Sequence, residues 1–196
     1  MKLTFKNDTF KILQIADTQE GRKVSPDTLA LINAALDREE PDLVVYSGDQ
    51  IWGRGFHGDV NQVRRVLKEL TAPVVERHLP FAICFGNHDR QVGLDNRAQF
   101  EIYKEIPGFI GEDTPGVDGV GNCVLEIADG DRPGYLLYLI DSHSSLKVGY
   151  DHVHQNQIDW YRGVRDSYEK QYGHTIPSVV IPVSYTHLRA HETRRH

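Results

Sequence analysis

The sequence predicts an α/β fold in which short apolar strands alternate with amphipathic helices. Apolar runs typical of buried strands recur along the chain, and between them apolar residues recur every three or four positions, as on one helix face. Such alternation is typical of parallel β-α-β units whose strands are buried on both faces. The chain has 196 residues, of which 39% are hydrophobic and 26% charged, and this suits one globular domain.

The first half of the chain predicts three strands with helices between them. We expect strands at 11–16, 42–47 and 80–85, and helices at 28–39, 59–78 and 96–106. Ser25 is the expected N-cap of the first helix, and Pro26 suits its first helical position. Pro73 marks a break or a new turn in the second helix.

The second half predicts a hairpin, a long helix and a further strand. A glycine-rich loop at 111–121 precedes strands at 122–128 and 135–140, which a turn-type cluster at 129–134 joins. A helix at 154–172 and a strand at 177–181 follow. The hairpin predicts a mixed sheet in this part of the fold.

Composition excludes several classes of function. The formal net charge is −6 and no basic stripe stands out, which argues against nucleic-acid or membrane-surface binding. No apolar stretch is long enough for a signal peptide or a membrane span. Cys84 and Cys123 lie inside apolar runs, as expected for reduced core residues of a cytoplasmic protein. Nothing in the composition indicates an oligomeric state.

The C-terminal residues differ in origin from the rest. Residues 183–193 match, codon by codon in one frame, the translation of a transposase-end adapter used in sequencing libraries. We therefore expect the N-terminal part of a single domain at 1–181 and a non-native tail at 182–196, the alternative being a natural basic tail. His187 and His191, spaced like a helical metal-ligand pair, would then be a false site.

Polar residues directly follow three of the predicted strands. These are Asp-Thr-Gln at 17–19, Gly-Asp-Gln at 48–50 and Gly-Asn-His-Asp at 86–89. Because the carboxyl ends of parallel strands open on one edge of a sheet, the three clusters can converge there. Carboxylate and amide oxygens with an imidazole suit one or two divalent cations, although each cluster alone also fits a turn or helix cap.

The series resembles the motifs of the calcineurin-like metallophosphoesterases, whose usual order is Asp-x-His, Gly-Asp, Gly-Asn-His-Asp, a strand-borne His and Gly-His-x-His. Segments at 116–122, 141–142 and 157–160 further resemble the purple-acid-phosphatase-like branch. The resemblance covers nearly all of residues 10–181. It implies a β-sandwich flanked by helices, in α-β-β-α layers, that is incomplete at the C-terminus.

This resemblance implies a metal-dependent phosphoesterase that hydrolyses a phosphate mono- or diester with a metal-activated water. Asp17 would ligate one metal ion, Asp49 would bridge both ions, and Asn87 would ligate the second. His88 would contact the phosphate and protonate or stabilise the leaving oxygen, with Asp89 holding its ring. A bridging carboxylate offsets the repulsion between two cations held about 3.5–4 Å apart.

Two features depart from the family's usual order. Gln19 stands where the first-motif histidine is usual, and its neutral amide oxygen favours Mn²⁺ or Mg²⁺ over Zn²⁺ or Fe. We expect Mn²⁺ first, with Gln19 either a metal ligand or a residue that hydrogen-bonds to a metal ligand. The strand histidine and the Gly-His-x-His motif are missing from the chain, so we expect this chain alone to hold half a site and to be inactive.

The sequence leaves two other functions open. A non-catalytic binding or scaffold protein on a degenerate phosphoesterase fold is the main alternative, and Gln19 favours it. A doubly wound nucleotide-binding module is the third, although no glycine-rich phosphate loop or Gly-x-Ser-x-Gly motif is present. The expected partner is a phosphate-ester substrate.

Several other polar residues have a simpler interpretation. Arg90 fits a phosphate contact or a surface salt bridge equally well. We interpret His143 as a polar loop residue at a strand end. We interpret His152 and His154, which precede a predicted helix, as capping and surface residues.

Overall fold

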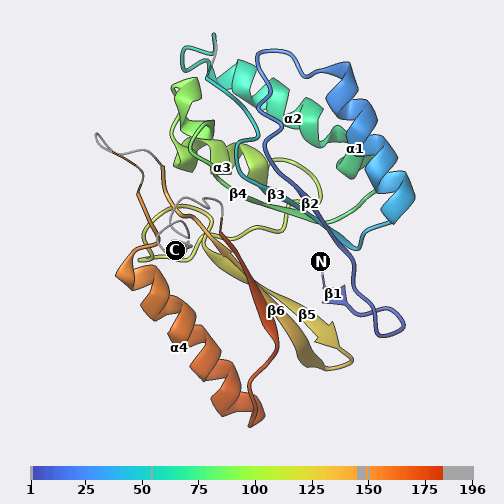
Figure 1. The fold of residues 1–196 in the computed structure, drawn as a ribbon, viewed down its shortest axis with the longest axis vertical. Helices are drawn as coiled ribbons and strands as arrows, with labels where there is room; N and C mark the ends of the chain where they lie inside the picture. The colour runs from blue at the N-terminus through green and yellow to red at the C-terminus, as the bar shows by residue number, and fades with distance from the viewer. Residues whose placement is uncertain (1, 54, 145–148, 150, 183–196) are drawn as a thin grey trace, which may run out of the picture.

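The computed structural model describes residues 2–53, 55–144, 149 and 151–182. The expected tail, beyond the backbone of residue 182, and the pair His187 and His191 lie outside the described residues. Within the described ranges the chain folds into two sheets and four α-helices (Figure 1). None of these helices has both the length and the apolar character needed to cross a membrane.

The first sheet is parallel and follows the predicted β-α-β order. Its strands β2, β3 and β4 pair in that order, and η1 and α3 follow β4. The bounds are β2 Ile12–Ile15, α1 Pro26–Glu39, β3 Leu43–Ser47, α2 Val60–Glu76, β4 Phe81–Cys84, η1 Asp89–Val92 and α3 Asn96–Lys104. Because β2, β3 and β4 run parallel, their carboxyl ends share one edge.

The second sheet is mixed and has the order β1-β5-β6-β7. Its elements are β1 Leu3–Thr4, β5 Cys123–Asp129, β6 Arg132–Ile140, α4 Gln155–Tyr172 and β7 Ser178–Pro182. Strands β5 and β6 form the predicted antiparallel hairpin. Strand β1 pairs in parallel with β5, and β7 pairs in parallel with β6. The hairpin turn is shorter than the sequence predicted, because β5 extends to Asp129 and β6 already begins at Arg132.

Alternate residues of the strands divide the core into layers. On β3, Val44 and Tyr46 pack against the helices α1 to α3, whereas Leu43 and Val45 face the second sheet. This alternation follows from the two-residue period of a strand. Figure 1 shows α1 to α3 on the outer side of the first sheet and α4 across the other sheet.

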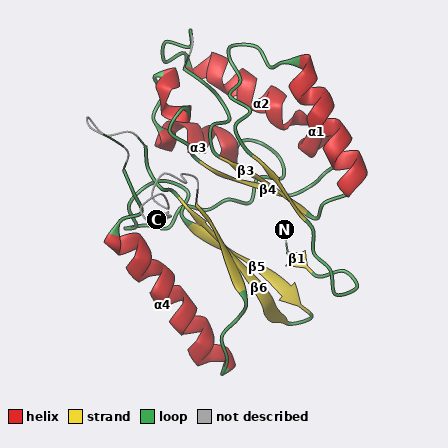
Figure 2. Cartoon of the chain, in the orientation of Figure 1, coloured by secondary structure: helices red, strands yellow, loops and turns green. Residues whose placement is uncertain are grey.

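The second sheet repeats this division. On β6, Leu137 and Leu139 face the space between the sheets, whereas Tyr138 packs against Trp160 and its neighbours on α4. The arrangement is the α-β-β-α sandwich that the family resemblance implied, as the red helices on either side of the yellow strands make clear (Figure 2).

The helix starts confirm the capping predictions, and one expected break is wrong. The Ser25 side chain accepts the N–H of Asp27, and Pro26 opens α1. Pro73, by contrast, lies inside a continuous α2. Its ring is buried with Val74 in the core, and Arg77 donates a hydrogen bond to the Pro73 carbonyl at 2.8 Å. Tertiary packing thus holds the last turn against the helix-breaking tendency of proline.

Candidate metal centre

The loops after β2 and β3 lie against each other at the carboxyl edge of the first sheet. The N–H of Asp17 donates to the Gly48 carbonyl at 3.1 Å, and the N–H of Gln19 donates to the Asp49 carbonyl at 2.9 Å. Asp17, Gln19 and Asp49 have φ angles of 54°, 46° and 55°, in the left-handed region that costs non-glycine residues energy. Strained backbone of this kind is concentrated at functional sites.

The loop after β4 joins the same cluster through Asp49. The N–H of His88 donates to Asp49 Oδ1 at 2.8 Å. Gly86 allows this approach, because a Cβ at that position would lie 2.1 Å from Asp49 Oδ1 and 2.4 Å from its backbone nitrogen. The sequence therefore correctly predicts that the three polar strand ends converge.

The buried side chain of Asp89 connects the loops of this cluster. Its side chain accepts the N–H groups of Gly86 at 2.7 Å, Asp49 at 3.0 Å and Ile51 at 3.1 Å. The residue is 1% exposed, and burial raises the pKa of its carboxyl to about 7 despite these N–H donors. Asp89 thereby ties the loop after β3 to the loop after β4.

The expected contact between Asp89 and the His88 ring is replaced by another. His88 Nδ1 lies 3.0 Å from the side-chain oxygen of Gln91, and the ring meets Trp52 edge to face with centroids 5.9 Å apart. The carboxylate of Asp89 is instead engaged by backbone donors. The prediction that Asp89 holds the His88 ring is therefore wrong. The oxygens of Asp89 accept backbone N–H groups from the loops after β3 and β4.

The electrostatics of the cluster fit a cation. Burial raises the pKa of Asp49, and the negative charge of Asp17 raises it further, whereas the His88 N–H lowers it. Two carboxylates close enough to repel each other suit a site for divalent ions, whose preferred ligands are oxygens. Gln19 Nε2 lies 3.5 Å from Asp17 Oδ1, and Asn87 is half-buried between Gly86 and His88. Metal ligation by Gln19 and Asn87 stays a prediction.

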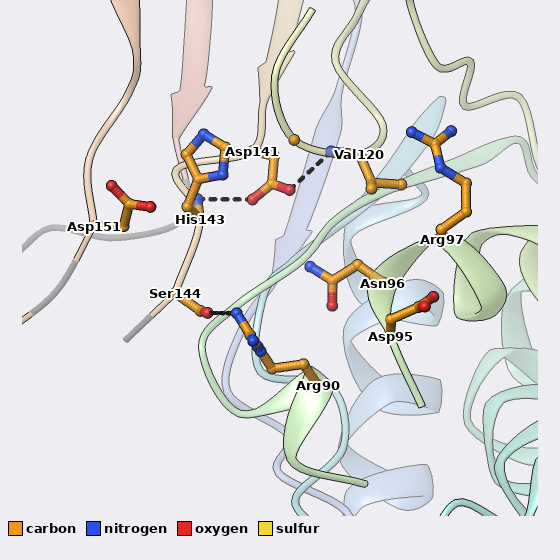
Figure 3. A pocket seen from close by; sticks show the side chains of 10 residues that line it. Arg90, Asp95, Asn96, Arg97, Val120, Asp141, His143, Ser144 and Asp151 are labelled. Carbon is orange, nitrogen blue, oxygen red and sulfur yellow. Dashed lines mark hydrogen bonds between the residues drawn. The ribbon is translucent and has the colours of Figure 1, made fainter. Parts of the chain in front are cut away.

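A pocket of about 330 Å³ opens beside this cluster, between the loop after β4 and the loop after β6 (Figure 3). Arg90 and Ser144 face each other across it, and the Arg90 guanidinium donates to Ser144 Oγ at 2.6 Å. The other lining residues include Arg97, Asp141 and His143. The carboxyl ends of β4 and β6 therefore border one polar depression.

The three segments that resemble the purple-acid-phosphatase-like branch meet in a buried polar network. Asn122 Oδ1 accepts the N–H of Asp141 at 3.0 Å and the side-chain amide of Gln157 at 2.9 Å. That amide also donates to the Asp141 carbonyl at 2.6 Å. Asn122 and Gln157 are completely buried. The network thus fixes the start of α4 to the end of β6.

A second group of possible metal ligands lies above this network. His143, Asp151 and His154 offer ligand atoms that all lie within 4.8 Å of one another, and no other such group of His, Cys, Asp or Glu occurs among the residues that the structure describes. From the sequence, His152 and His154 are expected to be capping and surface residues. His154 is the N-cap of α4 as expected, yet its ring stacks on His143, with centroids 4.1 Å apart. The Asp-x-x-His spacing at 151–154 was the signal available.

Comparison with known proteins agrees with this architecture. A family model described as calcineurin-like phosphoesterase matches residues 10–181. Phosphatase DCR2 of Saccharomyces cerevisiae is 31% identical over 185 residues, which cover 80% of this chain and 32% of that protein. "Probable inactive purple acid phosphatase 14" of Arabidopsis thaliana is 28% identical over 195 residues, which cover 82% of this chain and 48% of that protein.

Among solved structures, a dimetal phosphatase from Danio rerio has a similar fold. The TM-score is 0.60 at 14% sequence identity, and the match covers 88% of this chain and 69% of that one. This chain spans about a third of the yeast relative and about half of the plant relative. At this identity the structural match speaks for the fold alone.

Proposed function

The chain belongs to the calcineurin-like phosphoesterase family, and from this premise we propose that the protein hydrolyses a phosphate mono- or diester with a metal-activated water. The observation that supports the proposal most directly is the pairing of Asp17 with Asp49. The loops that carry them hydrogen-bond each other, burial raises the pKa of the Asp49 carboxyl, and the charge of Asp17 adds to this rise, so the two carboxylates repel each other. A pair of divalent cations bound there would replace this repulsion with attraction.

In this proposal Asp17 holds one ion, Asp49 bridges both and Asn87 holds the second. Two divalent ions would polarise the phosphate oxygens and lower the pKa of the attacking water. The left-handed backbone at Asp17 and Asp49 turns their side chains out of the strand direction, and Asp89 keeps the loops in register. The missing imidazole ligands would come from native sequence that continues the domain after residue 181.

His88 is the proposed general acid. Its Nδ1 faces the side-chain oxygen of Gln91, which accepts a hydrogen bond when Nδ1 carries the proton. In the imidazolium form Nε2 carries the second proton, and this is the proton that the ring would donate to the leaving oxygen. Gln91 would act as a positioning residue for this ring, in place of the expected Asp89.

Arg90 and its pocket are the proposed site for the remainder of the substrate. The guanidinium lies two residues after His88 in the chain and borders a depression that also contains Asp141 and Ser144. An arginine next to a phosphate-binding centre can hold an oxyanion with two parallel N–H groups. The contact to Ser144 supports a fixed guanidinium rather than a freely moving one.

We propose Mn²⁺ as the preferred ion and the cytoplasm as the location. Gln19, Asn87 and the two aspartates offer oxygen atoms, a ligand set that suits Mn²⁺ and Mg²⁺ better than Zn²⁺, with Fe a further possibility. Cys84 and Cys123 are free, buried thiols, as is usual in a reducing compartment.

The test is hydrolysis of p-nitrophenyl phosphate and its bis ester by the gene product that includes the native continuation after residue 181. Asp49→Asn should abolish Mn²⁺-dependent turnover, because it removes the bridging charge. Asp129→Asn, at the exposed end of β5, is the matched control and should retain it. An Asp49→Asn protein with undiminished turnover would refute the proposal.

The second candidate is a binding or scaffold protein on the same fold. Two observations favour it: Gln19 replaces the usual histidine, and several relatives from Arabidopsis thaliana carry names that call them inactive purple acid phosphatases. This candidate predicts that the gene product with its native continuation hydrolyses neither p-nitrophenyl phosphate nor its bis ester, whether Mn²⁺, Mg²⁺, Zn²⁺ or Fe is added. It also predicts that Asp49→Asn leaves partner binding intact.

A further inference from the structure

We propose that His143, Asp151 and His154 form a mononuclear site for a divalent transition-metal ion, Zn²⁺ in the first place. None of these residues belongs to the predicted dinuclear set, and they come from the loop after β6 and the start of α4. Their ligand atoms lie within 4.8 Å of one another. Two imidazole nitrogens with one carboxylate oxygen are a known ligand set for zinc sites that keep an open position.

The surroundings of His143 determine which of its nitrogens is free to bind a metal. Gln157 Nε2 donates to Asn122 Oδ1 and to the Asp141 carbonyl, so the orientation of this buried amide is fixed. Its oxygen therefore faces the other way, where it accepts the N–H of His154 at 2.7 Å and lies 3.1 Å from His143 Nε2. Because an amide oxygen only accepts, His143 Nε2 carries the proton and Nδ1 carries the lone pair.

His154 is oriented in a comparable way. Its Nδ1 lies 2.8 Å from Asp118 Oδ2, and its Nε2 lies 3.1 Å from Asp151 Oδ1. With the proton of Nδ1 donated to Asp118, the lone pair of Nε2 points toward the Asp151 carboxylate. Either a second proton on the ring or a metal ion between the two atoms makes this contact favourable, and a bound ion would displace that proton. In zinc sites a ligating histidine usually donates its other ring N–H to a carboxylate, as His154 does here to Asp118.

The site is also accessible and supported by the fold. All three side chains are half-buried, and His143 and Asp151 line the pocket of about 330 Å³ that opens to solvent. The N–H of His143 donates to Asp141 Oδ1 at 2.8 Å, which holds a residue with a φ of 65° in place. An entry path, a defined tautomer and outer-shell hydrogen bonds are the features that a metal site requires.

Two neutral imidazoles and one carboxylate select the ion. Imidazole nitrogen suits Zn²⁺, Co²⁺ and Ni²⁺, whereas Mg²⁺ and Mn²⁺ prefer a shell of oxygens. The site should therefore prefer a different ion from the oxygen-rich cluster at Asp17 and Asp49. This difference allows the two centres to be tested separately.

The test measures Zn²⁺ bound per chain after equilibrium dialysis of the Asp17→Asn/Asp49→Asn double variant, which lacks the carboxylates of the predicted dinuclear centre. We expect one Zn²⁺ per chain. Adding His154→Gln should weaken binding by more than about 100-fold, because it removes a direct ligand and not only an outer-shell partner. His174→Gln, beyond the opposite end of α4, is the matched control and should not change it. Because the dinuclear carboxylates are absent throughout, the result does not depend on the proposed hydrolase function.

A spectroscopic measurement and a milder variant complete the test. Co²⁺ should give the visible absorption of a four-coordinate site in the double variant, and His143→Gln should remove it. Asp118→Asn should retain one ion per chain with affinity about 10–100-fold lower, since it changes only the outer shell. The proposal is overturned if the double variant binds no Zn²⁺, or if His154→Gln binds it as tightly as the His174→Gln control.

Discussion

Replacing the carboxylate of Asp89 should loosen all three strand-end loops at once. Its oxygens accept the N–H groups of Gly86, Asp49 and Ile51, and the residue is 1% exposed. In Asp89→Ala each of these donors loses its acceptor, and a buried donor without a partner costs about 1–3 kcal/mol. Water that reaches the half-buried Asp49 offsets part of this cost. We expect a loss of about 3–5 kcal/mol, a large share of the about 5–15 kcal/mol that stabilises a domain.

The Asp89→Asn variant keeps the shape of the side chain but replaces one carboxylate oxygen with an NH₂ group, which donates instead of accepting. Oδ2 serves the donors of Gly86 and Asp49, and one amide oxygen can take its place. The amide nitrogen then faces the N–H of Ile51, so one donor is left opposite another donor. We expect a loss of about 1–3 kcal/mol, smaller than that of the alanine variant.

Urea unfolding followed by circular dichroism measures both losses. Asp95→Ala is the control, because Asp95 lies in the same stretch of chain but serves a single donor, the N–H of Ala98. Loss of such an N-cap costs about 1 kcal/mol. If Asp89→Ala proved no more destabilising than Asp95→Ala, Asp89 would not be the anchor of the loops.

Three further predictions follow from individual contacts. Gly86→Ala should cost about 2 kcal/mol or more in thermal unfolding, because the added Cβ meets Asp49 at 2.1 Å; an unchanged melting temperature would contradict it. Burial tends to raise the pKa of Asp42, but a backbone N–H and the Lys6 ammonium lower it overall, so Asp42→Asn should cost about 1–2 kcal/mol at neutral pH. This difference should fade as the pH falls through the lowered folded pKa, and a constant difference would exclude the charge as its cause. Gln157→Leu should cost about 2–4 kcal/mol in urea unfolding, since the Asp141 carbonyl and the His154 N–H lose their Gln157 partner and Asn122 Oδ1 keeps only the N–H of Asp141, whereas a loss below about 1 kcal/mol would argue against the network.

The elements of the fold follow from local chemistry, but the number of sheets does not. Ser25 and Pro26 identify the start of α1 because capping is a property of adjacent residues. The run at 43–46 is apolar throughout, since one face contacts helices and the other contacts a second sheet. A buried strand between two helix layers would have the same composition. The sandwich therefore depended on the family resemblance rather than on periodicity.

Part of the candidate site could likewise be predicted from the sequence, and part could not. Convergence of Asp17, Asp49 and His88 could be predicted because parallel strands direct their carboxyl ends to one edge. The role of Asp89 could not, because its partners are backbone N–H groups from loops that the sequence does not relate. The meeting of His143 with His154 likewise depends on where α4 lies on the second sheet.

The buried network joins the segments at 116–122, 141–142 and 157–160 and places exact demands on two of their side chains. Asn122 must accept at its side-chain oxygen and donate at its nitrogen, which reaches the Asp118 carbonyl at 2.7 Å. Gln157 must donate twice on one side and accept on the other. No apolar or singly functional side chain of that size meets these demands in a dry environment. These residues therefore hold the β6–α4 junction, and with it His143, at the edge of the pocket.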